Sequence, residues 1–178
     1  DTQWDDVYEN YLPTSGHGSD DNADFDPFSQ QSRPQTLRDY LLWQLNLIRL
    51  SERDWAIAMT VIDAIDAGGY LRTDAQELID TLGDLTLDLE EVTTLIHRVQ
   101  SFDPPGVGAR DLRECLILQL RQLPVETLAR DLALAVCERG FEYLPRSDLA
   151  ALMRLLEAPE EATRAALGLI RRLNPRPG

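Results

Sequence analysis

The chain of 178 residues contains no lysine, only two cysteines and two histidines, and no long hydrophobic run. The Cys and His residues lie far apart in the sequence, without the spacing of metal ligands, so we expect no metal and no cofactor. Cys115 and Cys137 lie in apolar helical patterns, where a free cysteine acts as a small hydrophobic side chain. No apolar run approaches the roughly 18 residues that span a bilayer, and no signal peptide is visible. We therefore expect a cytoplasmic protein in a reducing compartment, without a membrane contact.

Positive charge is scarcest at the start of the chain. Residues 1–28 hold eight Asp or Glu and no Arg, against 23 acids and 17 arginines in the remainder. The formal net charge of the whole chain is −14. Because cations that neutralise phosphates supply most non-specific affinity for nucleic acid, a chain this acidic is a poor nucleic-acid binder as a whole.

Residues 1–35 lack hydrophobic periodicity and are rich in Asp, Gly and Ser. A segment of this composition buries too little apolar surface to fold alone, so we expect it to be acidic, flexible and largely disordered. It nevertheless contains spaced aromatic residues: Trp4, Tyr8, Tyr11, Phe25 and Phe28. The segment is therefore either a solvated linker or an acidic tail whose aromatics dock on a partner.

Apolar residues recur at helical spacing from residue 37 onward, and no alternating strand pattern interrupts them. Capping residues and helix breakers divide this pattern into about eight helices, over 37–48, 52–67, 74–82, 89–102, 112–123, 125–143, 148–156 and 159–173. The expected N-caps are Ser51, Thr73, Asp88, Asp111 and Ser147. We expect an all-α fold.

The helices are expected to pack as two helical subdomains. Pro124 interrupts the pattern most sharply, so we place an N-terminal subdomain at 36–123 and a C-terminal subdomain at 124–178, ending in a linker at Asn174–Gly178. The glycine-rich stretch at 103–109 is the second choice for the boundary.

The stretch Phe102–Leu112, here called the connector, is the least ordinary part of the sequence. Pro104 and Pro105 fix two φ angles and remove two backbone donors, while Gly106 and Gly108 permit angles that other residues resist. We expect a bent joint that sets the angle between the flanking helices. A phosphate-binding loop does not fit, because two positions lack an N–H, no Lys follows and no strand precedes.

The sequence offers no catalytic constellation. Asp63 and Asp66 are expected one turn apart on the polar side of a helix, where they are solvated rather than paired for hydrolysis. His97 lies between Ile96 and Arg98 on a mid-helix face, which is typical of a surface or boundary residue. We therefore predict that the chain is not an enzyme.

A DNA-binding helical regulatory domain is the alternative from another class of function. The region 125–173 has the helical pattern of a helix-turn-helix, with three arginines between positions 164 and 172. Three glutamates between positions 157 and 161 crowd the same region, so DNA contact there is not the favoured reading.

Four blocks of the sequence, in this order, resemble the sigma-54 class of bacterial RNA polymerase sigma factors. The blocks are Leu37–Asn46 (LRDYLLWQLN), Ile62–Leu71 (IDAIDAGGYL), Val99–Leu116 (VQSFDPPGVGARDLRECL) and Leu173–Gly178 (LNPRPG). From the first block to the last, the resemblance extends over about residues 36–178. Four blocks in the family's order are a far more specific signal than any one of them except the connector.

The resemblance implies that residues 36–178 correspond to the family's region that binds core RNA polymerase, in part on the β subunit. It implies two packed helical subdomains, no enzymatic activity, and a variable acidic segment at residues 1–28. The family's N-terminal region, which meets ATP-dependent activators, and its promoter-reading C-terminal domain have no counterpart here. Promoter DNA is therefore expected to be contacted only through parts that this sequence lacks.

Docking needs a few rigidly presented anchors, which are often aromatic residues or arginine. We expect partner contacts from the connector and its surroundings, at Trp43, Tyr70, Phe102, Asp103, Pro104, Pro105, Gly106, Val107, Gly108, Arg110 and Arg113. The alternative for the three aromatic residues is ordinary core packing. The alternative for the two arginines is pairing with Asp111, Glu114 or helix carbonyls.

The acidic segment suggests a separate hypothesis, that residues 1–28 mimic nucleic acid and occupy a basic channel of the polymerase. Deleting residues 1–28 should then remove much of the salt dependence of polymerase binding, because salt screens exposed charges. Dissociation constants measured over a range of salt concentrations check this, and an unchanged slope for the shortened chain would refute it.

Overall fold

The computed structural model describes residues 35–178 of the chain. The expectations for residues 1–34, including the disorder of the acidic segment and its aromatic contacts, lie outside the described residues. Everything that follows concerns residues 35–178.

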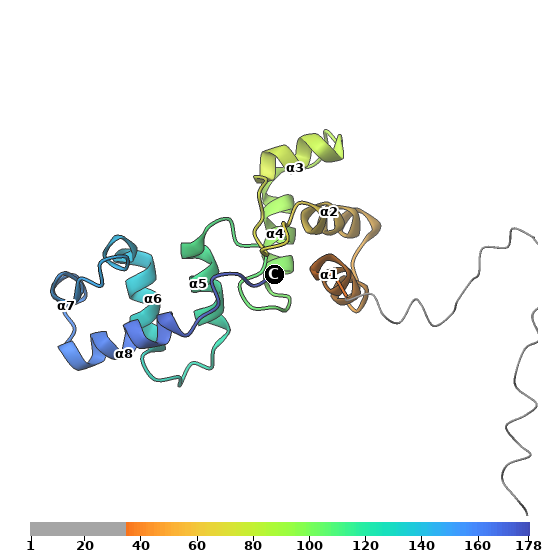
Figure 1. Cartoon of the computed structure of the whole chain (residues 1–178). Helices are drawn as coiled ribbons and strands as arrows, with labels where there is room; N and C mark the ends of the chain where they lie inside the picture. The colour runs from red at the N-terminus through yellow and green to blue at the C-terminus, as the bar shows by residue number, and fades with distance from the viewer. Residues whose placement is uncertain (1–34) are drawn as a thin grey trace, which may run out of the picture. The chain divides into compact units, whose positions relative to one another are not determined.

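Eight α-helices joined by short turns make up most of the described residues (Figure 1). In chain order they are α1 (Leu37–Asn46), α2 (Glu52–Asp63), α3 (Ala75–Leu82), α4 (Leu89–Gln100), α5 (Leu112–Gln122), α6 (Arg130–Arg139), α7 (Leu149–Leu156) and α8 (Glu160–Arg171), with the short 3-10 helix η4 (Phe141–Tyr143) before α7. Residues 35–178 hold isolated bridges, Ile65 with Leu71 and Tyr70 with Ala109, but no β-strand. The expected all-α fold of about eight helices is confirmed.

Three of the expected N-caps begin their helices as predicted. Ser51, Asp88 and Asp111 each accept a hydrogen bond from the backbone N–H three residues further on. These N–H groups belong to the first turn of a helix and have no carbonyl partner within it, so the caps satisfy donors that would otherwise be unpaired.

Two caps lie one residue later than expected. Helix α3 is capped by Asp74 rather than Thr73, and α7 by Asp148 rather than Ser147. In both places an aspartate follows the hydroxyl residue. Its negative charge interacts favourably with the positive end of the helix dipole, which a hydroxyl does not do to the same extent.

Helix α2 is shorter than the periodicity suggests, because it ends at Asp63 and not near Gly68. The side chain of Asp66 explains the change of direction. Its Oδ1 accepts hydrogen bonds from the backbone N–H groups of Gly68 (2.9 Å) and Tyr70 (3.0 Å), and its Oδ2 pairs with Arg72 (2.6 Å). The expectation that Asp66 is a solvated helical residue was wrong, since it organises the turn after α2.

Helix α6 begins at Arg130, five residues after the expected start at Val125. Val125 and Leu128 are 73% and 85% exposed, so the apolar stripe expected there does not face a core. Ala129, just before the helix, has a φ of 66°, a left-handed conformation that interrupts any helix running through it.

The buried apolar side chains form two main clusters. The first unites α1 to α4, with Leu41, Val61 and Val99 fully buried, and also takes in Val107 of the connector. The second unites α5 to α8, with Leu120 and Val136 among its fully buried members. The division of subdomains at Pro124 stays a prediction, and the packing of α5 with the second cluster favours the connector as the place where the two cores separate.

The closing residues, expected to form a linker, lie against the first part of the fold. The amide of Gln119 in α5 pairs with the backbone of Asn174, accepting from its N–H (2.8 Å) and donating to its carbonyl (2.6 Å). The Tyr70 hydroxyl donates to the carbonyl of Pro175 (2.6 Å), and Pro177 is buried. The chain after α8 therefore joins the two clusters.

Gly69 has no room for a side chain at this junction. Its φ is 91°, and a Cβ at this position would lie 2.7 Å from Cγ of Pro177 and 2.9 Å from the backbone nitrogen of Gly178. We expect Gly69→Ala to lower the free energy of unfolding by about 1–3 kcal/mol, measured by urea denaturation. Gly168→Ala is the control, since its added Cβ meets nothing within 4 Å on α8 and should raise stability by about 0.5–1 kcal/mol. A Gly69→Ala protein as stable as the wild type would contradict this account.

Candidate docking surface

The connector is fixed at its beginning by α1. The side-chain amide of Gln44 donates from Nε2 to the carbonyl of Asp103 (2.7 Å) and accepts from its backbone N–H at Oε1 (2.8 Å). The two bonds imitate those between paired strands and satisfy both polar groups of one peptide residue. The bend that begins at Asp103 is therefore tied directly to α1.

The end of the connector is held from inside. Gln100 is 4% exposed, and its Nε2 donates to the carbonyl of Gly108 (3.0 Å) and to the carboxylate of Glu114 (3.2 Å). A Cβ on Gly106, whose φ is 92°, would lie 2.9 Å from Sγ of Cys115. The expectation that these glycines are needed for the bend therefore has a direct steric basis.

Arg110 and Glu114 form an ion pair across the start of α5. Glu114 accepts from the backbone N–H of Arg110 (2.8 Å) and from its guanidinium Nε (3.2 Å). Partial burial acts to raise the pKa of Glu114, but the hydrogen bonds from Arg110 outweigh this and hold that pKa below its ordinary value. The same pairing raises the pKa of the Arg110 guanidinium.

Arg113 joins α5 to the end of α6. Its Nε donates to the carbonyl of Cys137 (2.9 Å) and its Nη2 to the carbonyl of Glu138 (2.5 Å). Carbonyls at a helix C-terminus lack partners within the helix and carry partial negative charge, so an arginine is well matched to them. In the free protein, Arg110 pairs with Glu114 and Arg113 with helix carbonyls, as the alternative expects. Both arginines nevertheless remain partly exposed to solvent.

Of the aromatic candidates, the structure buries two and exposes one. Tyr70 and Phe102 are 9% and 7% exposed, so core packing accounts for both. Trp43 is 53% exposed on α1, where its ring stacks on Tyr40 with 5.9 Å between centroids and an angle of 11° between planes. The stacking holds the indole in place while much of it faces solvent.

The remaining connector residues divide in the same way. Gly106, Val107 and Gly108 are buried, Pro104 is half-buried, and Asp103 and Pro105 are exposed. The candidates that a partner can reach without a rearrangement of the free chain are Trp43, Asp103, Pro105, Arg110 and Arg113.

Sequence reasoning missed Leu47, which is 65% exposed on the turn of chain that follows α1. It lies four residues after Trp43 and three after Gln44, spacings that place residues on neighbouring parts of a helix surface. We call Trp43 and Leu47, together with the exposed Asp103 whose backbone Gln44 binds, the α1 face. The signal was available in the spacing, but the sequence alone does not separate an exposed leucine from a buried one.

Both thiols are poorly suited to chemistry. Cys115 and Cys137 are buried, and burial raises the pKa of both, that of Cys137 to about 11. Within residues 35–178 no group of three His, Cys, Asp or Glu is placed to hold a metal ion. Over the same residues no helix combines the length and the apolar character that crossing a bilayer requires.

The described residues thus form a helical frame with exposed apolar side chains, Trp43 and Leu47 among them, that are candidates for contact with another protein. The chain matches the family model described as "Sigma-54 factor, core binding domain" over residues 26–178. It belongs to the sigma-54 factor family, and the resemblance of the four sequence blocks is confirmed.

Curated relatives agree with this family. The chain is 40% identical over 179 residues to the RNA polymerase sigma-54 factor of Salmonella typhimurium and 38% identical over 180 residues to that of Escherichia coli, in each case across all of this chain and 37% of the relative. The corresponding factor of Xanthomonas euvesicatoria is 43% identical over 165 residues, across 92% of this chain and 34% of the relative. The chain spans little more than a third of the length of these relatives.

The ion pair in the connector should make stability depend on pH in the acid range. Because the folded-state pKa of Glu114 lies below its ordinary value of 4.5, its contribution is present above that pH and is lost as the pH falls through the folded-state pKa. Glu114→Gln should therefore flatten the rise in unfolding free energy with pH in the acid range at and below the ordinary pKa of 4.5.

Urea denaturation at a series of pH values measures this rise. Arg110→Gln keeps the carboxylate but removes its guanidinium partner, so it should flatten the same part of the curve to a smaller extent. Equal slopes for wild type and Glu114→Gln would show that the pair does not act as described.

Proposed function

We propose that this chain is a fragment of a sigma factor whose residues 36–178 bind core RNA polymerase for transcription initiation, by protein–protein contact and without catalysing a reaction. The observation that carries the proposal is the match of residues 26–178 to the core binding domain of the family. Two buried thiols whose pKa is raised are compatible with it.

The wider activity of the family extends the proposal beyond this chain. The relatives are almost three times as long as this chain. We propose that contacts to promoter DNA and to ATP-dependent activators are made by parts outside the matched third. We propose that the chain itself acts in the cytoplasm, where the polymerase is, and that the β subunit is among its contacts.

The DNA-binding alternative loses support from the ion pairing of α8. Arg164 pairs with Glu160 one turn before it (2.7 Å), and Arg171 donates to the hydroxyl of Ser147 (3.0 Å). These arginines have partners within the fold, and the net charge of the chain opposes phosphate binding. Core polymerase rather than duplex DNA is therefore the proposed partner.

We propose the α1 face as one surface of this contact. Trp43 supplies a large aromatic group of the type that dominates interface energetics, and Leu47 extends the apolar area beside it. The pair of hydrogen bonds between Gln44 and Asp103 keeps this surface in a fixed position beside the connector. A contact prepared in the free chain costs little ordering entropy when it forms.

Replacing both side chains with alanine should weaken binding without unfolding the chain. For Trp43→Ala with Leu47→Ala we expect about a 30-fold increase in the dissociation constant for core polymerase, because central aromatic anchors contribute most of the energy of an interface. Fluorescence anisotropy with labelled chain measures the affinity. Urea denaturation should show a loss of at most about 2 kcal/mol, because both side chains are more than half exposed and the stacking on Tyr40 is lost.

Leu128→Ala is a matched control, since Leu128 is 85% exposed on another turn. If the wild type does not bind core polymerase, the proposed function is wrong. If it binds and the double variant binds equally well, the function stands and the α1 face is not the contact.

A further inference from the structure

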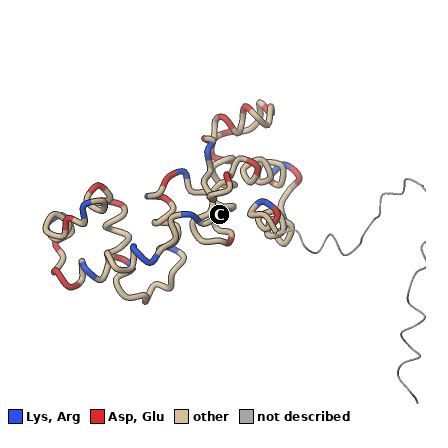
Figure 2. Tube along the Cα trace, in the orientation of Figure 1, with Lys and Arg blue, Asp and Glu red and all other residues tan. Residues whose placement is uncertain are grey.

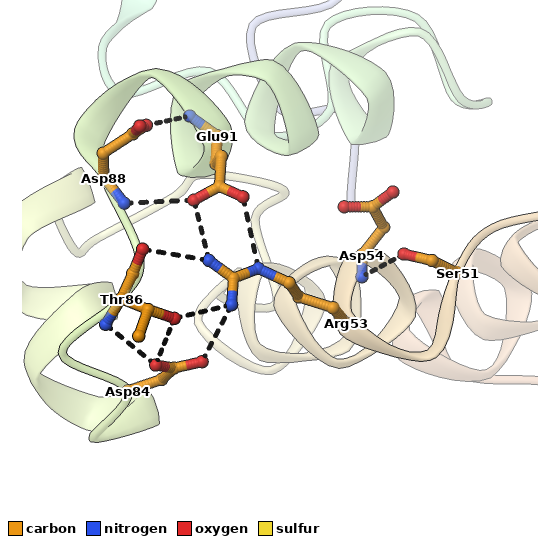
Figure 3. Close-up of polar contacts among 7 residues, drawn as sticks. All are labelled: Ser51, Arg53, Asp54, Asp84, Thr86, Asp88 and Glu91. Atoms are coloured by element: carbon orange, nitrogen blue, oxygen red, sulfur yellow. Dashed lines mark hydrogen bonds and ion pairs between the residues drawn. The ribbon is translucent and has the colours of Figure 1, made fainter.

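The turn between α3 and α4 is held by a single arginine from α2. Arg53 binds the carboxylate of Glu91 with two bonds, from Nε (3.2 Å) and Nη2 (2.9 Å). Its Nη1 donates to Asp84 (3.1 Å) and to the hydroxyl of Thr86 (2.7 Å), and its Nη2 donates to the carbonyl of Thr86 (3.0 Å). Figure 3 shows the guanidinium plane between these groups.

Each of the five N–H groups of this guanidinium has an acceptor. The turn is braced further from within, because Asp84 accepts from both the backbone N–H (2.9 Å) and the hydroxyl (2.7 Å) of Thr86. The capping box of Asp88 with Glu91 adds two more bonds at the start of α4. These bonds together hold the turn against α2 and against the start of α4.

This rigid turn presents leucine to solvent. Leu85 is 100% exposed and Leu89 is 52% exposed, whereas Leu87 between them packs against the first hydrophobic cluster. We call residues 83–89 the leucine turn. Three alternate leucines thus divide into one that anchors the turn and two that face outward. A fixed apolar projection of this kind loses little conformational freedom on binding.

The negative charge around the leucine turn indicates which kind of partner would bind there. Between Arg72 and His97 the chain has seven acids and no Lys or Arg, and five of the acids are exposed: Asp74, Glu77, Asp80, Asp88 and Glu90. Figure 2 shows red and no blue along α3. Arg53, the cation at the turn, is fully engaged by hydrogen bonds.

This negative charge argues against a nucleic acid, an anionic lipid surface or a second copy of this chain as the binding partner. Nucleic acid and anionic lipid surfaces are repelled by it. A second copy of this chain would bring another net charge of −14 to the contact, and like charges facing each other oppose association. What remains is a protein surface with an apolar pocket for the leucines and basic residues around that pocket.

We infer that the leucine turn is a second docking element, whose Leu85 and Leu89 enter an apolar pocket rimmed by Arg or Lys on a protein partner. The inference rests on the proposed function in naming that partner, which is core RNA polymerase. The apolar side chains supply binding energy, and the acidic surroundings direct the approach and raise the rate of association.

The test uses the whole 178-residue chain and purified core polymerase. Leu85→Ala with Leu89→Ala should increase the dissociation constant at least tenfold at moderate salt, with an unchanged circular dichroism spectrum, since both side chains lie outside the cores. Asp80→Asn with Glu90→Gln lies outside the Arg53 network, and should slow association and reduce its dependence on salt. Leu128→Ala should bind as the wild type does.

The outcomes separate the inference from the function on which it rests. A wild-type chain that fails to bind polymerase overturns the proposed function. Binding by the wild type with equal affinity for the double leucine variant overturns the leucine turn alone. An unchanged salt dependence in the charge variant overturns the basic rim. Sedimentation that shows a wild-type dimer, lost in the double leucine variant, would assign the turn to a second copy instead.

Discussion

Three stretches of backbone that are far apart in the sequence meet at Gly69, and the arrangement of the two hydrophobic clusters depends on this meeting. The carbonyl of Gly69 accepts from the N–H of Gly108 in the connector (2.8 Å), while the carbonyl of Gly68 accepts from the N–H of Gly178 (3.1 Å). Side chains would keep these backbones apart, so glycine is required where they touch. Within residues 35–178, no disulfide and no β-sheet holds the two clusters together.

Glutamine side chains complete the junction. Gln44, Gln100 and Gln119 come from three different helices, and each bonds to backbone groups of a non-helical segment. An amide satisfies both a donor and an acceptor of the main chain and carries no charge whose desolvation must be offset. These three glutamines therefore hold the non-helical segments to the helices through bonds to the main chain that need no charged group.

The sequence predicted what depends on local pattern and missed what depends on distant contacts. Helical periodicity and the caps at Ser51 and Asp88 gave most helices, because each signal lies within one or two turns of chain. The stripe from Val125 failed because a left-handed Ala129 interrupts it, and nothing in apolar spacing reveals that. The bonds of Arg53 span 31 to 38 residues, so its role is not visible before the fold is known.

The family blocks located the connector correctly, but could not say which of its residues face outward.

The burial of both native thiols has a practical consequence for measuring how exposed surfaces of this chain approach a partner. With the pKa of Cys115 and Cys137 raised and both side chains enclosed, maleimide reagents react slowly with either. A cysteine introduced at an exposed position would be labelled selectively in the otherwise natural sequence, so that a fluorophore could report on distances to an assembly as it forms.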